Sequence, residues 1–187
     1  GEKGSWFSKN KLFFSGSVFQ FFIPEIQKYA FCKFRDFRHI NAAHGLLGQV
    51  FDTFTDSEEN DLHIVTAADF LFGPRSIYKW PSLRKESGWK LLGILNSPDD
   101  DIVPDFKSAQ ATNKVAQDES STGPWYPIHN LCHRGPNCEY MQIRHLEHFL
   151  LTPTLALVWR TGMEYCRIHD LDPKLYFDLN DAGIKST

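Results

Sequence analysis

The fold class of this 187-residue chain is decided by one apolar stretch, Val18-Phe19-Gln20-Phe21-Phe22-Ile23, which is followed by Pro24. Aromatic and β-branched residues favour strands, and a proline cannot donate to a ladder of backbone hydrogen bonds. We therefore expect a buried strand over residues 18–23 that ends at Pro24. Nine of the sixteen phenylalanines lie before Arg38, so this strand should be one of several in the first part of the chain.

Four more segments before residue 96 have the composition of strands. They are apolar and are bounded by turn residues: residues 31–37, 46–54, 62–66 and 89–95. The first of them alternates between apolar and basic side chains, which is typical of an antiparallel sheet with one covered face. If this sheet forms, its inward side chains are buried, among them Phe19, Phe21, Phe34 and Val50.

The rest of the chain divides into a polar part and a helical part. Residues 96–126 are mainly polar and predict a long loop, which should be mobile over residues 107–122. Residues 141–151 and 154–166 carry apolar side chains at helical spacing on either side of Pro153. We therefore predict one α+β domain over residues 1–187. It has a mainly antiparallel sheet in residues 1–95 and, in residues 127–187, a Cys/His-containing turn and two helices packed against the sheet.

Composition narrows the possible partners. The chain has 20 basic and 23 acidic residues and a net charge of −3, so it lacks the basic excess of a general nucleic-acid binder. No run of 18 apolar residues occurs, which predicts that nothing spans a membrane. Four cysteines and no Asn-X-Ser/Thr acceptor favour an intracellular setting. Secretion stays open, because Gly1 is compatible with a removed leader.

The strongest chemical signal is a segment rich in cysteine and histidine. Residues 129–148 hold two of the four cysteines and four of the eight histidines. The turn Arg134-Gly135-Pro136-Asn137 lets two thiols fold back toward each other, and thiolates with imidazoles are the ligands that zinc prefers. We expect a structural zinc ion bound by Cys132, Cys138, His145 and Cys32, with Cys166 as another source of the fourth ligand. A Cys132–Cys138 disulfide and unrelated buried thiols are the alternatives.

The same segment resembles the zinc-binding loop of the His-Me finger endonucleases. In this resemblance His129 is the general base, and Cys132, Cys138 and His145-Leu146 form the loop. The sequence departs from the family pattern where an asparagine should hold a divalent ion, because Thr152-Pro153-Thr154 occupies that region. The resemblance implies a metal-dependent nuclease.

The sequence lacks the common motifs of nucleotide-binding proteins and serine hydrolases: a P-loop, a dinucleotide fingerprint and a Gly-X-Ser-X-Gly motif. Several aromatic residues, such as Trp80 and Trp125, are in loop-like positions, and exposed aromatic residues often anchor interfaces. We therefore expect a non-catalytic interaction or structural module of a larger protein or assembly, with a protein partner and a structural zinc site. The alternatives are the nuclease and a secreted, disulfide-containing, effector-like domain.

Overall fold

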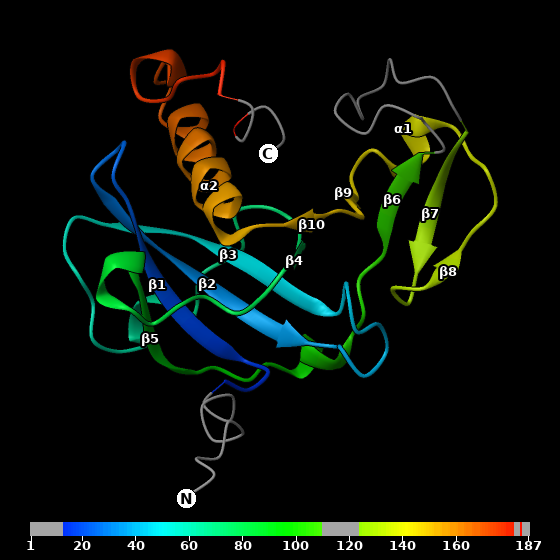
Figure 1. The fold of residues 1–187 in the computed structure, drawn as a ribbon, viewed down its shortest axis with the longest axis horizontal. Helices are drawn as coiled ribbons and strands as arrows, with labels where there is room; N and C mark the ends of the chain where they lie inside the picture. Colours follow the sequence, from blue (N-terminus) through cyan, green and yellow to red (C-terminus); the bar gives the residue numbers. More distant parts are fainter. Residues whose placement is uncertain (1–12, 110–123, 182–183, 185–187) are drawn as a thin grey trace, which may run out of the picture.

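The predicted first strand is β1 (Ser17–Ile23), and it lies inside a six-stranded sheet, the large sheet. The computed structural model describes residues 13–109, 124–181 and 184. It shows an α+β fold of two mostly antiparallel sheets and one main helix (Figure 1). In order across the large sheet, the strands are β10 (Leu151–Thr152), β4 (Arg75–Ile77), β3 (Leu46–Thr55), β2 (Lys28–Asp36), β1 and β5 (Trp89–Ile94). Only the β10–β4 pair is parallel.

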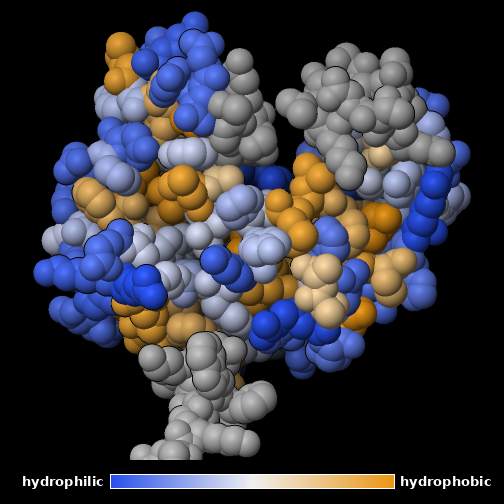
Figure 2. All heavy atoms as spheres, in the orientation of Figure 1, coloured by the Kyte–Doolittle hydropathy of each residue, from blue (hydrophilic) through white to orange (hydrophobic). Residues whose placement is uncertain are grey.

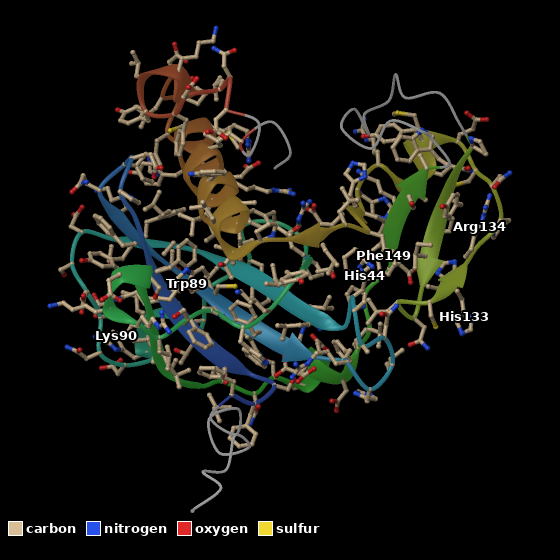
Figure 3. The ribbon with its side chains drawn as sticks, viewed as in Figure 1. His44, Trp89, Lys90, His133, Arg134 and Phe149 are labelled. Atoms are coloured by element: carbon tan, nitrogen blue, oxygen red, sulfur yellow. The ribbon has the colours of Figure 1, made fainter. Side chains whose placement is uncertain are left out.

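The central strands of the large sheet are buried on both faces. Phe19, Phe21, Phe34 and Val50 are all 0% exposed, which confirms the predicted burial. They belong to the main core, which packs under the helix α2 (Thr154–Ile168). On the opposite face, the cluster around Phe31 is covered by residues 62–68 and by side chains of β5 and the residue after it. Figure 3 shows this alternation on β5, where Trp89 and Lys90 point to opposite sides of the sheet.

The helix α2 leaves no room for a side chain at Gly162, where it packs on Phe177 and on β1. A Cβ atom at Gly162 would lie 2.4 Å from Phe177 Cζ and 3.1 Å from Ile23 Cγ2. This helix confirms the second of the two predicted C-terminal helices. Within the described ranges of the chain, every helix is too short or too polar to cross a membrane.

The first predicted C-terminal helix, over residues 141–151, is wrong. The structure has a single turn, α1 (Tyr140–Ile143), followed by the two short strands β9 (Glu147–His148) and β10. Pro153 favours an extended conformation at Thr152, and both strands find parallel partners far away in the sequence, β9 on β6 and β10 on β4. These tertiary pairings outweigh the helical spacing of the apolar residues.

Two other expectations need correction. Residues 62–66 do not form a strand but contain a 3-10 turn, η1 (His63–Val65), whose first amide donates to Asp61 Oδ1 at 2.9 Å. The predicted loop over residues 96–126 contains strand β6 (Phe106–Ala109) and the start of β7 (Trp125–His129). Residues 110–122 of the predicted mobile segment lie outside the described residues. The other 3-10 turns are η2 (Lys85–Ser87), η3 (Pro98–Asp101) and η4 (Pro173–Leu175).

The second, small sheet has the strand order β8 (His133–Arg134), β7, β6 and β9. It docks on the end of the large sheet through a cluster of buried side chains: Phe37, Leu47, Phe106, Ile128 and Leu131. At this junction the rings of His44 and Phe149 stack with their centroids 4.3 Å apart (Figure 3). The strands β9 and β10 then connect the small sheet to the edge of the large sheet and to α2 (Figure 1).

Candidate functional site

The structure places the predicted zinc ligands in different environments. Cys32 is 0% exposed in the main core under α2, and burial raises the pKa of its thiol. Cys132 is exposed in the turn after β7, and His145 is exposed after α1. Cys138 is partly buried and donates its backbone amide to Trp125 O at 2.8 Å.

These residues do not form a metal-binding group in this structure. All four cysteines are free of disulfides, Cys166 included. Among the residues that the structure describes, no three His, Cys, Asp or Glu side chains are grouped so that they could hold a metal. Zinc binding therefore stays a prediction.

The histidine assigned as a general base makes a different contact. His129 Nδ1 lies 2.9 Å from Asp105 Oδ2, and both side chains are about half exposed, at 47% and 44%. The turn that follows is tight, because Asn130 and Leu131 both have positive φ angles of 48° and 61°. Its strain is offset by Leu131, which is fully buried at the junction of the two sheets. The geometry therefore gives the turn after His129 a structural role, as the tip of a hairpin that packs at the junction of the two sheets. The nuclease stays a hypothesis.

A cluster of buried charges connects β9 to α2 and to the large sheet. Glu147 accepts two hydrogen bonds from Arg160, at 2.7 and 2.8 Å, and one from Arg75 Nη1 at 3.1 Å. We call these three residues the Glu147 clamp. Gly73 lies against it, since a Cβ there would be 2.7 Å from Glu147 Cγ. Burial alone would raise the pKa of Glu147, but the two arginines outweigh it and hold that pKa below its usual range.

His148 lies beside the Glu147 clamp and stays neutral. Burial, together with the positive charges of Lys107 and Arg75, lowers the pKa of His148 to about 4. Its Nδ1 atom is buried without a hydrogen-bond partner among the described residues. Figure 2 shows strongly hydrophilic atoms on this face, between α2 and the small sheet. The carboxylate of Glu147 already accepts hydrogen bonds from both arginines of the clamp. We therefore interpret the clamp as a connection between the sheets rather than as a ligand site.

A cavity lies on the other face of the large sheet. Its volume is about 460 Å³, within the range of about 300–1,000 Å³ that is typical of small-molecule sites. It lies between β2, β3 and the segment after β5, which runs along the side of the sheet opposite α2 (Figure 1). We call it the Arg35 pocket.

Arg35 is the central polar group of this pocket. Its side chain projects from β2 away from α2, because the neighbouring Phe34 faces the main core. Arg35 is only 8% exposed. Its Nη1 donates to the backbone carbonyls of Ile102 at 3.1 Å and of Asp99 at 3.4 Å. Its Nε is buried and has no hydrogen-bond partner among the described residues. Burial lowers the pKa of Arg35, although Asp100 and Asp99 oppose this.

The walls of the Arg35 pocket combine apolar surface with one more polar group. Phe70 is 40% exposed and stacks on Phe51 with ring centroids 4.8 Å apart. Ile102, which is 61% exposed, and two prolines complete the apolar wall. Gln49 from β3 also lines the cavity. This combination of apolar walls and a few convergent polar groups is the usual anatomy of a binding site.

The charges around the pocket are nearly balanced. Lys33 is 2% exposed and pairs with Asp100 at 2.6 Å, while its Nζ also donates to Ser97 Oγ at 3.0 Å. Asp100 in turn accepts from the amide of Ser97 at 2.7 Å. Asp99 is exposed to solvent. The Lys33–Asp100 pair is therefore self-contained, and Arg35 is the buried cation at this pocket without a carboxylate in hydrogen-bonding contact.

Sequence reasoning missed this site. It placed Lys33 and Arg35 on the outward face of a strand, as their alternation with Cys32 and Phe34 indicates. The segment that buries them lies more than 60 residues later in the chain. The aromatic residues that suggested an interface belong to the core instead: Trp125 is 5% exposed, and Trp80 stacks on Phe13 with centroids 5.3 Å apart.

Comparison with known proteins adds no assignment to this geometry. No family model, no curated protein and no solved structure matches the chain.

Proposed function

We propose that this protein is a non-catalytic binding module that holds its ligand in the Arg35 pocket. One observation carries the proposal: a cavity of about 460 Å³, with the exposed apolar side chains of Phe70 and Ile102 in its walls, is lined by the buried cation Arg35. A ligand that fills the cavity removes the apolar surface of Phe70 and Ile102 from water, which stabilises the complex by about 25 cal/mol per Å² of apolar area buried.

The chemistry of the walls defines the ligand in general terms. The ligand joins a compact apolar group, which contacts Phe70 and Ile102, to a hydrogen-bond acceptor that reaches Arg35. Such a group belongs either to a small molecule or to the end of a protein partner. This proposal keeps the interaction module expected from the sequence and gives it a defined surface.

Titration of isotope-labelled protein with phenylacetate and with its neutral amide, phenylacetamide, tests the proposal by NMR. Ligands of this size bind at millimolar Kd, which corresponds to about −4 kcal/mol. We expect shifts at Gln49, Phe70 and Ile102. Phe70→Ala should weaken binding about 5- to 10-fold, because the ring contact contributes about 1 kcal/mol or more.

A matched control is available in Tyr78. It is another exposed aromatic residue, at 69%, and it does not line the pocket. Tyr78→Ala should leave the affinity for either probe unchanged. The proposal fails if neither probe shifts the pocket residues, or if the two alanine variants weaken binding equally.

A further inference from the structure

We propose that Gln49 selects the ligand of the Arg35 pocket by pairing with a hydrogen-bond donor and an adjacent acceptor. This inference rests on the binding function proposed above and specifies the chemical class of its ligand. The ligand presents an N–H group beside a carbonyl oxygen on one edge of a planar group, as a lactam ring or a primary carboxamide does.

The strand register places the side chain of Gln49 on the floor of the pocket. Gln49 in β3 is the cross-strand partner of Lys33 in β2. The next residue, Val50, belongs to the main core under α2, and successive side chains of a strand point to opposite faces of the sheet. Gln49 therefore points to the face away from α2, where it lines the cavity.

The side-chain amide of Gln49 is accessible and unpaired. Gln49 is half-buried, and no other described residue forms a hydrogen bond with either end of its amide. Both ends are open to solvent, because the fully buried, unpaired side-chain atoms of the described chain belong to other residues: Glu25, Arg35, Arg75 and His148. An amide offers one acceptor oxygen and two N–H donors. A ligand in the cavity therefore meets a donor and an acceptor that the fold leaves unused.

An amide edge is matched by a planar group with a donor next to an acceptor. Glutamine recognises adenine in this way, through two hydrogen bonds to neighbouring groups of the base. An ordinary peptide bond is trans, so its N–H and C=O groups point in opposite directions and only one of them can pair with Gln49. Lactams and primary carboxamides carry both groups on the same side, which makes them the matching class.

The surroundings of Gln49 favour a neutral and flat ligand. The charge of its neighbour Lys33 is already balanced by Asp100, at 2.6 Å. Phe51 lies on the same face of β3 two residues further on, about 7 Å away, and Phe70 stacks on it with ring centroids 4.8 Å apart. Because Phe70 is 40% exposed and lines the same cavity, it offers an aromatic wall to a ring whose edge pairs with Gln49.

The closing experiment compares isocarbostyril, a flat bicyclic lactam, with N-methylisocarbostyril, which lacks the N–H donor. NMR titration of the wild-type protein gives Kd for each compound. We expect the lactam to bind about 5- to 10-fold more tightly, the effect of about one net hydrogen bond. Equal affinity would overturn the role of Gln49 while leaving the binding function intact. Absence of shifts at Phe70 and Ile102 with both compounds would instead remove the binding function, and this inference with it.

The variant Gln49→Met separates hydrogen bonding from the bulk of the added methyl group. Methionine keeps the length of the side chain but cannot form the pair, so the preference for the lactam should disappear. Gln142→Met, in α1 and outside the pocket lining, is the matched control and should keep the wild-type preference. A preference that persists in Gln49→Met would overturn the proposal, because the N–H group would then be recognised elsewhere or the methyl group excluded by its size. Shifts at Phe70 with the N-methyl compound report that the pocket of the variant is intact.

A second pair of probes identifies what carries the donor and the acceptor. Phenylacetamide is compared with N,N-dimethylphenylacetamide, which has no N–H group. A preference for phenylacetamide that Gln49→Met removes supports the proposal and extends it to primary carboxamides. A preference confined to the lactam pair supports it and assigns the two groups to a ring. Absence of a preference in both pairs counts against a donor–acceptor site.

Discussion

The neutral His148 beside the Glu147 clamp makes the stability of this protein depend on pH. The pKa of His148 is about 4 in the folded protein, whereas an unfolded histidine titrates near about 6.5. The folded pKa is the lower one, so the stability contribution is complete above pH 6.5 and is lost as the pH falls from 6.5 to 4.

The magnitude follows from proton binding. In this window the unfolded chain binds a proton that folded His148 does not, which costs about 1.4 kcal/mol per pH unit. At pH 5 the loss is about 2 kcal/mol, and solvent screening at this partly buried site reduces it to about 1–2 kcal/mol. For a chain of this size the melting temperature should then fall by about 2–8 °C.

His148→Phe removes the titrating group and keeps a ring at this position. Urea unfolding followed by tryptophan fluorescence, at pH 8 and pH 5, gives the free energy of unfolding for each protein. We expect the drop between these two pH values to be smaller in His148→Phe by about 1–2 kcal/mol. His145→Phe, a change at an exposed position nearby, is the control and should retain the wild-type drop. An identical drop in wild type and His148→Phe would refute the reasoning, and His148→Gln repeats the test if the first variant folds poorly.

Three further changes test the packing, the clamp and the metal hypothesis. Gly162→Ala places a methyl group 2.4 Å from Phe177 Cζ and should lower the free energy of unfolding by about 1–3 kcal/mol; an unchanged value in urea unfolding would contradict the close packing of α2. Glu147→Gln leaves two arginines without their carboxylate and should lower the free energy of unfolding by about 2–4 kcal/mol. Calorimetry measures this loss, and an unchanged value would show that the clamp does not stabilise the fold. If the zinc hypothesis holds, elemental analysis finds one zinc ion per chain that Cys138→Ser removes, and a metal-free wild-type protein would exclude it.

The large sheet could be predicted because its signal is local. Alternation of apolar residues in β1 and β2 and the proline after β1 are visible within a few residues, and the burial of Phe19 and Phe34 follows from them. The strands β9 and β10 could not be predicted in this way. Each has two residues, and each exists because of a partner strand that lies far away in the sequence.

The candidate site was hidden from the sequence for the same reason. Residues 31–37 alternate as an exposed strand would, and nothing near Arg35 indicates that η3 and Ile102 will cover it. The spacing of cysteines and histidines is clear in the sequence, but it does not determine which of these side chains lie close together in the fold. Cys32, expected to supply the fourth ligand, belongs to the large sheet, whereas Cys132 follows a strand of the small sheet.

Two buried arginines lie on opposite faces of the large sheet and have different partners. Arg75 and Arg35 both have a buried Nε without a partner among the described residues, but Arg75 also contacts the carboxylate of Glu147. Arg35 donates hydrogen bonds to two backbone carbonyls, and its guanidinium lies over the ring of Phe37, 5.6 Å from the ring centroid. Removing a buried cation that is paired with a carboxylate is strongly destabilising, because the carboxylate is left uncompensated. Removing Arg35 leaves two neutral carbonyl oxygens without that donor, which costs less.

The two arginines should therefore respond differently to the same substitution. Arg75→Met should lower the free energy of unfolding by about 2–4 kcal/mol, because it leaves part of the charge of Glu147 uncompensated. Arg35→Met removes the donor to two backbone carbonyls and should cost only about 1–2 kcal/mol in ligand-free protein, while abolishing the binding of phenylacetate. Urea unfolding of both variants beside the binding titration separates the two roles. If Arg35→Met were as destabilising as Arg75→Met, Arg35 would be a structural residue, and the pocket around it would lose the group that makes it a site.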